Sequence, residues 1–271
     1  MRSQFGYSHW KKEHRFVLET LPGKDVFMFF SGGKDSSMAM DFMLRAGKDF
    51  GFDFTAHAGA FPVHRYTDSE KLRIGSYWHE RGVNIIWHLF EETDDIIRQA
   101  ENPCLSCQKI RKRMLGALVS RAAHDLENLV LVTSYSLWDI VSYSMEHILG
   151  EMFSCSEKGA GSGKSNRFVE TSQRFYPFFR MKEGYTVFRP LVRYNNSDIQ
   201  ALIESEGIPT LSIPCDFSES RPKRILEKYY EKMEARFDYD RVFAFAKSAL
   251  DLPDISSYTN LEMKEYLLDI F

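Results

Sequence analysis

The sequence has few cysteines, no long apolar run and no excess of positive charge, and each shortage excludes a class of protein. Only four of the 271 residues are cysteine, too few for the disulfide framework of a small secreted domain. No segment approaches the roughly 18 consecutive apolar residues that a membrane span requires, and MRSQFGYSHWKKEHRF at the N-terminus lacks the apolar core of a signal peptide. We therefore expect a cytoplasmic protein without a membrane segment.

The formal net charge is -3. This excludes a protein that binds nucleic acid over its whole surface, because neutralising phosphates requires an excess of Lys and Arg. A local basic patch remains compatible with the composition. Hydrophobic residues make up 44% of the chain, which is enough for a substantial buried core.

Short apolar runs alternate with longer segments of helical period, and this alternation is typical of a parallel sheet covered by helices on both faces. We predict an α/β fold: a Rossmann-like open parallel sheet of about five strands, followed by C-terminal helices. The expected strands are 25–31, 52–60, 83–90, 128–134 and 185–191. The expected helices are about 35–46, 69–81, 105–125, 137–150 and 196–206, with two more over much of 222–249.

The stretch from about 153 to 183 interrupts this alternation with Gly, Ser and charged residues, and we predict a surface insertion there. It contains GAGSGKS, which resembles a Walker A loop. Lys158 stands where that pattern needs its first glycine, however, and no strand leads into it. The insertion is therefore not expected to bind phosphate.

The segment FFSGGKDSSMAM, residues 29–40, joins the first expected strand to the first expected helix. Two glycines let backbone amides approach a ligand closely, and a helix N-terminus presents unpaired N–H donors with partial positive charge. We expect the helix to begin near Asp35 or Ser36, both good N-cap residues. The hydroxyl of Ser31 would add a donor and Lys34 would neutralise a polyphosphate. A bare S-G-G would fit a tight, well-capped turn equally well, but the whole string predicts a phosphate site.

The string Ser-Gly-Gly-Lys-Asp-Ser after a first strand resembles the signature of the PP-loop ATP pyrophosphatase superfamily, also called the adenine nucleotide alpha hydrolases. In that superfamily the loop binds the pyrophosphate portion of ATP, and the enzyme cleaves between the α and β phosphates. The resemblance implies ATP and Mg²⁺ as ligands and a PP-loop ATPase domain over 24–215, preceded by an extension (1–23) and followed by a helical segment (216–271) packed on the same domain. The residues expected to bind the nucleotide are Ser31, Gly32, Gly33, Lys34, Asp35, Ser36, His57 and Ser134.

Cys104 and Cys107 form a C-x-x-C pair at the opening of a predicted helix. Such a pair suits a redox couple, a zinc half-site or two ligands of an iron–sulfur cluster, and the pattern alone does not separate them. Cys215, in IPTLSIPCDFSESRP, follows the last predicted strand and helix. That position returns the chain to the carboxyl edge of the sheet, where open α/β sheets bind their ligands. Cys155 lies in the predicted insertion and is expected to be a bystander.

From about residue 24 to 250, the order of motifs resembles the tRNA 2-thiocytidine synthetases, the TtcA-like group. The motifs are the glycine loop, NPCLSC followed by a basic helix, TSYSLWDIVSYSMEHIL, VFRPLVRYNNSDIQAL and IPC. Members of the group are thought to carry an oxygen-sensitive 4Fe-4S cluster on three cysteines, with one iron open to bind sulfur. The resemblance assigns Cys104, Cys107 and Cys215 as ligands. It also implies a tRNA or other pyrimidine-containing substrate, a sulfur donor such as a cysteine desulfurase, and a homodimer.

The chain departs from the group's pattern in two places. Ser218 stands where many members have a further cysteine, which disfavours a closed four-cysteine zinc site. In SYSLWDIV, residues 134–136 replace a Gly-His-His string and only Asp139 remains of an acidic pair. Asp139 is expected to orient Mg²⁺ or the phosphates; otherwise it is a first-turn carboxylate that the helix dipole favours.

The expected reaction is adenylation followed by sulfur transfer. The substrate oxygen attacks the α phosphate of ATP, pyrophosphate leaves into the glycine loop, and sulfur then displaces AMP. Asp35, Asp139 and Arg111 are the expected catalytic residues, the last of them in the basic run QKIRKR. A patch for RNA phosphates, or simply a solvated helix face, is expected from Lys109, Lys112, Arg113, Arg221, Lys223 and Arg224.

Other functions remain compatible with these motifs. One is a PP-loop enzyme acting on a small molecule, either a desulfidase or an ATP pyrophosphatase that forms an amide or amidine bond. Another is a non-catalytic nucleotide-binding protein, because the Asp139 region is altered. A phosphoadenylyl sulfate reductase is disfavoured, since that class lacks the intact loop and uses a cysteine near its C-terminus, whereas no cysteine follows Cys215.

Overall fold

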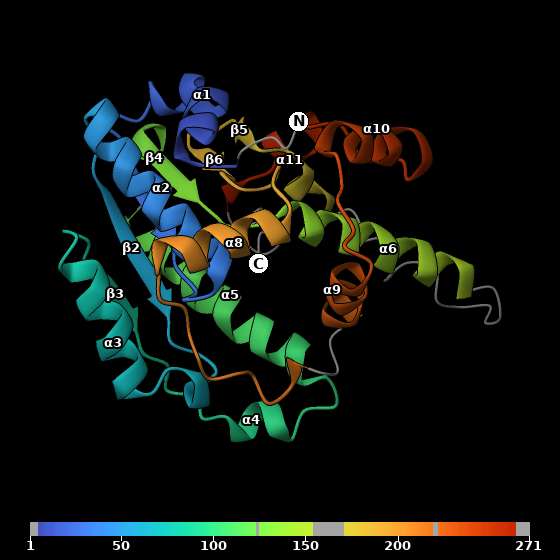
Figure 1. Ribbon diagram of the computed structural model, residues 1–271, viewed down its shortest axis with the longest axis horizontal. Coiled ribbons are helices and arrows are strands. Elements are labelled where there is room, and N and C mark those ends of the chain that lie inside the picture. Colours follow the sequence, from blue (N-terminus) through green and yellow to red (C-terminus); the bar gives the residue numbers. More distant parts are fainter. Residues whose placement is uncertain (1–4, 123–124, 154–170, 219–221, 264–271) are drawn as a thin grey trace.

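The computed structural model describes residues 5–122, 125–153, 171–218 and 222–263 (Figure 1). Cys155, the GAGSGKS stretch and Arg221 lie outside these ranges. In the described part of the chain, no helix combines the length and the apolar character needed to cross a bilayer.

One six-stranded sheet forms the centre of the molecule, in the order β3-β2-β1-β4-β6-β5 (Figure 1). All neighbouring pairs are parallel except β5 and β6. The predicted Rossmann-like parallel sheet is therefore confirmed. The strands are β1 (Asp25–Phe29), β2 (Phe54–Gly59), β3 (Ile85–His88), β4 (Leu129–Val132), β5 (Phe178–Arg180) and β6 (Thr186–Phe188).

β5 was not predicted, because it falls inside the segment expected to be a surface insertion. It has only three residues and pairs antiparallel with β6, with Phe178 opposite Phe188 and Arg180 opposite Thr186. A strand this short carries no readable alternation of apolar and polar residues. Part of the expected insertion thus completes one edge of the sheet.

Helices occupy every position where the sequence predicts one. These are α2 (Lys34–Phe50), α3 (Asp68–His79), α5 (Pro103–Ala122), α6 (Leu137–Phe153), α8 (Asn196–Glu206), α9 (Pro222–Lys232) and α10 (Tyr239–Ala249). The structure adds α1 (Tyr7–Leu18) and two single-turn helices, α4 (Asp95–Arg98) and α11 (Ser256–Thr259).

Both faces of the sheet are covered, and the alternation along β1 and β4 shows how. Val26 and Met28 of β1 pack with α1, α2, α3 and α8 in one core. Phe27 and Phe29, which alternate with them, belong with Leu129 and Leu131 of β4 to the cluster that packs against α5 on the other face. Successive strand residues point to opposite faces, so apolar residues at both parities are what a strand buried on both faces requires.

α1 belongs to the main core, although its segment was assigned to an extension. Trp10 and Leu18 are fully buried among residues of α2 and β6. The indole of Trp10 packs 5.1 Å from the ring of Phe42 and donates a hydrogen bond to the carbonyl of Pro190, at 2.7 Å. Segments 180 residues apart in sequence are joined by this contact.

His14, also on α1, makes stability depend on pH. Burial is the main cause that lowers its pKa to about 4, whereas a histidine in the unfolded chain has a pKa near 6.5. Between these values the unfolded state binds more protons, so stability falls as the pH falls through this window. We expect this histidine to account for about 2 kcal/mol of the loss in unfolding free energy from pH 7 to pH 5.

The measurement is urea unfolding of the wild type and of His14→Gln at both pH values. The variant should show a smaller difference between the two, because its side chain does not titrate in this range. An identical pH dependence in the two proteins would contradict the assignment.

Candidate functional site

A cleft of about 280 Å³ opens at the carboxyl ends of β1 and β4. The chain runs from β1 outward to β2 on one side, while β4 lies on the other side of β1, so the cleft sits where the strand order reverses. Open α/β sheets bind ligands at such a point. The walls come from the glycine loop, the end of β2, one face of α5, the β4–α6 junction and the start of α9.

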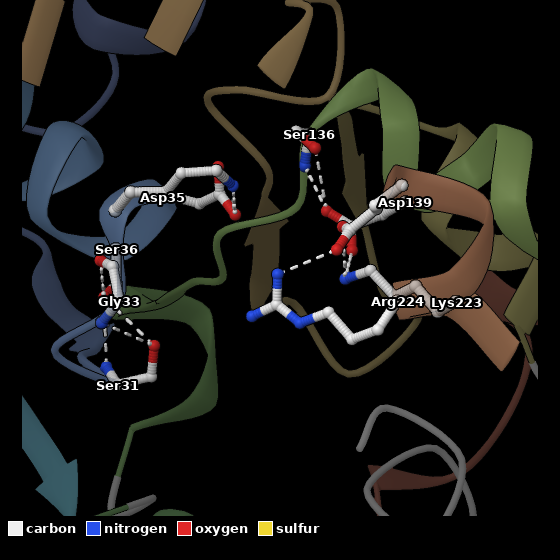
Figure 2. Close-up of polar contacts among 10 residues, drawn as sticks. Ser31, Gly33, Asp35, Ser36, Ser136, Asp139, Lys223 and Arg224 are labelled. Atoms are coloured by element: carbon white, nitrogen blue, oxygen red, sulfur yellow. Dashed lines mark hydrogen bonds and ion pairs between the residues drawn. The ribbon is translucent and has the colours of Figure 1, made fainter. Parts of the chain in front are cut away.

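The glycine loop begins α2 slightly earlier than predicted. The helix starts at Lys34 with Gly33 as its N-cap, so Asp35 and Ser36 lie in the first turn and do not cap it. Ser36 Oγ instead donates to the carbonyl of Gly33 (2.9 Å) and accepts from the amide of Ser31 (3.2 Å), as Figure 2 shows. The first helical bond is that of Ser37 N–H to Gly33 O, so the amides of residues 34–36 are available to an anion.

The loop residues divide into those that face the cleft and those that do not. Ser31, Gly33, Asp35 and Ser36 line it, as predicted for a phosphate site, while Gly32 and Lys34 are not among the lining residues. The ammonium of Lys34 pairs with the carboxylate of its neighbour Asp35 at 2.9 Å. Lys34, the cation that was expected to neutralise a polyphosphate, is thus already paired with a carboxylate in this structure.

Gly32 is required for a steric reason. Its φ is +69°, and a Cβ there would lie 2.7 Å from Cγ of Leu211. The amide of Leu211 also donates to the carbonyl of Gly32, at 2.7 Å. The loop is therefore packed against a segment that follows α8, residues 209–218, which we call the cysteine strap because it carries Cys215.

The carboxylate of Asp139 is buried and fully engaged (Figure 2). One oxygen accepts from the amide of Ser136 (2.7 Å), which is one half of a capping box at the start of α6, and also from the hydroxyl of Ser136 (3.0 Å). The other oxygen pairs with the ammonium of Lys223. Asp139 lines the cleft, but both of its oxygens have partners from the chain itself. This agrees with the alternative role of a carboxylate that stabilises the first turn of α6.

His57 forms part of the cleft wall at the end of β2. One ring nitrogen lies 3.0 Å from Nε2 of His88 and the other 2.9 Å from Oγ1 of Thr55. Burial, reinforced by His88, lowers the pKa of His57 to about 4. The ring is therefore neutral near pH 7. It lines the cleft, but both of its nitrogens already have partners in the chain.

Arg111, on α5, also lines the cleft. Its guanidinium has no hydrogen bond or ion pair with any residue in the described ranges. A half-buried guanidinium of this kind, in a cleft that also offers helix amides, is suited to an anionic ligand. Ser134, at the β4–α6 junction, lines the same cleft.

Arg174 also lines the cleft, and sequence reasoning missed it. The residue is 7% exposed, and its guanidinium stacks 4.7 Å from the ring centroids of both Tyr135 and Tyr143. It lies in the stretch expected to be an insertion, where no periodicity or motif marks a single arginine. Only the tertiary structure brings it to the two tyrosines.

The cysteine strap runs from the glycine loop to the cysteine pair, along the orange segment between α8 and α9 in Figure 1. Beyond Leu211 it is held by side chains of the β2–α3 region: Glu70 accepts from Ser212 N–H (2.8 Å), Arg65 donates to Ile213 O (3.0 Å), and His64 Nε2 accepts from Asp216 N–H (3.2 Å). These bonds fix the path of the strap along the β2–α3 region.

At its far end the strap meets the start of α5. The thiol of Cys104 lies 3.9 Å from the carbonyl of Phe217. Phe217 and Cys107 pack on the same small cluster, which includes Phe61 and Ile110. The structure thus brings the segments of all three predicted ligands together. Their thiols do not converge, since no three His, Cys, Asp or Glu side chains in the described part of the chain are placed to hold a metal.

Comparison with known proteins gives a match in structure only. No protein-family model matches the sequence, and no curated protein matches it. The chain is similar to the U34-tRNA thiolase NcsA from Methanococcus maripaludis, which was solved with its 4Fe-4S cluster: the TM-score is 0.62 at 15% identity, over 92% of this chain and 82% of that one.

Two synthetases are more distant. For the NH3-dependent NAD synthetase from Campylobacter jejuni the TM-score is 0.46 at 15% identity, over 91% of this chain and 94% of that one. For NMN synthetase from Francisella tularensis it is 0.44 at 13% identity, over 97% and 93%. At 15% identity the likeness to the thiolase concerns the fold, and it agrees with the Rossmann-like α/β sheet predicted from the sequence.

Proposed function

We propose that this protein is an ATP-dependent PP-loop enzyme that adenylates a carbonyl oxygen of a nucleobase, with release of pyrophosphate, and replaces that oxygen with sulfur. The observation that carries the proposal is the continuity of the site. The glycine loop, which lines the cleft together with Arg111, is bonded through Gly32 to the strap, and the strap reaches Cys104 at its other end. The fold shared with a tRNA thiolase supports the same reading.

The chain's own residues fit the first half of the reaction. Amides of the first turn of α2, with the hydroxyls of Ser31 and Ser36, would hold the pyrophosphate portion of ATP. The guanidinium of Arg111 would contact the α phosphate as the substrate oxygen attacks it. The bond to the β phosphate then breaks and pyrophosphate leaves. Mg²⁺ would travel with the phosphates, near Asp35, which is the cleft carboxylate closest to the loop.

The second half needs a sulfur source at the adenylated carbon. We propose Cys104, Cys107 and Cys215 as ligands of a 4Fe-4S cluster, because three thiolates suit such a cluster and the strap places the segment of Cys215 against that of Cys104. When bound, a cluster on three cysteines supplies one iron that is free to carry sulfur. The chain contributes the thiolates and the path of the strap.

The proposed substrate is the C2 position of a tRNA cytidine or a related pyrimidine, with a cysteine desulfurase as sulfur donor and a homodimer as the assembly. Lys109, exposed on α5 beside the cysteine pair, is available to RNA phosphates. Arg113 pairs with Glu92, so its part in such a patch is reduced. A non-catalytic nucleotide-binding protein is the second candidate, favoured by the engagement of both oxygens of Asp139.

The test is anaerobic purification followed by iron, sulfide and zinc analysis of the wild type and of Cys104→Ala, Cys107→Ala and Cys215→Ala. About four irons per chain, lost in each variant, are expected for the cluster. Cys155→Ala is the matched control and should keep its iron. Stoichiometric zinc, or no metal in the wild type, would contradict the cluster. Separately, formation of AMP and pyrophosphate from ATP and unmodified tRNA would distinguish an enzyme from a nucleotide-binding protein.

A further inference from the structure

Lys223, in the first turn of α9, was expected to face solvent in a patch for RNA. The structure instead places it in the wall of the cleft, together with Ser31 and Asp35 of the glycine loop. Its ammonium pairs with Asp139 and lies 3.6 Å from Glu227 Oε1 (Figure 2). A helix from the C-terminal part of the chain thus adds a cation to the site.

The two carboxylates that hold this ammonium are both buried, Asp139 at 2% and Glu227 at 4% exposure. Buried carboxylates require partners, but each of these has a second one. Asp139 accepts two hydrogen bonds from Ser136, and Glu227 accepts one from Arg224, at 2.8 Å. If Lys223 turns toward a ligand, Glu227 keeps its ion pair with Arg224 and Asp139 keeps both bonds from Ser136, so the cost falls on the second oxygen of Asp139 alone.

The charges around Lys223 include two from the glycine loop, besides those of Glu227, Arg224 and Asp139. Asp35 and Lys34 both act on its ammonium electrostatically, and burial in the cleft wall lowers its pKa. Because burial disfavours the charged ammonium group, a new contact with an anion would stabilise it. The flexible four-carbon side chain of lysine allows the group to move to such an anion. Phosphate groups are anions that the N-terminus of α2, in the same cleft, is suited to bind.

We propose that Lys223 is a ligand of the ATP triphosphate, exchanging Asp139 for an oxygen of the β or γ phosphate when nucleotide enters the cleft. This rests on the proposed function, because it takes ATP as the occupant. It goes beyond that function by assigning a phosphate ligand to α9, outside the glycine loop.

The experiment compares dissociation constants for ATP and AMP, measured by calorimetric titration, in the wild type and in Lys223→Gln, Lys223→Arg and Lys232→Gln. We expect Lys223→Gln to weaken ATP binding by about tenfold or more, since a charge-assisted hydrogen bond is lost. AMP binding should stay within about twofold, because AMP lacks the β and γ phosphates. Lys223→Arg keeps the cation and should retain most of the affinity. Lys232→Gln, an exposed position on the same helix, should behave as the wild type.

Unchanged ATP affinity in Lys223→Gln would overturn the proposal, and so would an equal loss for ATP and AMP, which is the result expected if Lys223 only tethers α9 to α6. If Lys223→Gln does not fold, acetylation of the wild type decides. ATP should protect Lys223 more than AMP does, with Lys232 labelled equally in both, and equal labelling of Lys223 would overturn it. A wild type that binds no ATP would contradict the proposed function itself, so the two failures are distinguishable.

Discussion

Replacing Gly32 with alanine is expected to weaken ATP binding by at least about a hundredfold and to lower the free energy of unfolding by about 2 kcal/mol. The backbone at Gly32 has a φ of +69°, and the added Cβ would lie 2.7 Å from Cγ and 2.9 Å from Cδ1 of Leu211. A left-handed conformation alone costs an L-residue roughly 1–2 kcal/mol.

The clash is not easily relieved, because the hydrogen bond from the amide of Leu211 to the carbonyl of Gly32 ties the two backbones together. Either the loop or the cysteine strap must move. A shift of the loop displaces Gly33 and the first amides of α2, which are the groups that would hold phosphate. Binding should therefore suffer more than stability.

The chain contains a matched control for this variant. Gly23 has a similar φ of +74°, but no atom lies within 4 Å of a Cβ built there. It precedes the amino end of β1, away from the cleft. Gly23→Ala should lose about 1 kcal/mol of stability and bind ATP normally. The pair, measured by calorimetric titration and urea unfolding, separates backbone strain from the contact with Leu211. Wild-type ATP affinity in Gly32→Ala would contradict the role given to the loop.

The parts of the fold that the sequence predicted are those encoded locally. An apolar run such as 128–134 and the helical period after Lys34 depend on neighbouring residues alone, so β4 and α2 were found to within a few residues. β5 was missed because three residues carry too little pattern. The single arginine at position 174 acquires its place only through Tyr135 and Tyr143.

The candidate site divides in the same way. The glycine loop was predicted because its chemistry is contained in six consecutive residues, and Ser31, Gly33, Asp35 and Ser36 do line the cleft. Which way Lys223 points could not be predicted, since its direction is decided by Asp139 on another helix. The cysteine ligands stay a prediction: their segments meet, but a spacing in sequence does not determine whether three thiols converge.

Replacing Trp10 with alanine is expected to cost about 3–5 kcal/mol of unfolding free energy, which is the usual loss for a large aromatic residue removed from a core. Trp10 is fully buried and packs against Phe42 of α2. Its indole N–H is also the donor to Pro190 O, so the variant leaves both a cavity and a carbonyl without its partner. A loss of this size approaches the whole stability of many domains.

Phe16 on the same helix is the control, because it is 63% exposed. Phe16→Ala should cost less than about 1 kcal/mol of unfolding free energy. The two variants can be compared by the midpoints of urea unfolding, provided that their m-values are equal. If Trp10→Ala were as mild as Phe16→Ala, residues 7–18 would be an appendage to the α/β domain. The expected difference would instead make α1 part of the core that supports the sheet: Trp10 joins α2, which begins at the glycine loop, to the chain just beyond β6, and removing it should loosen the cleft as well as the fold.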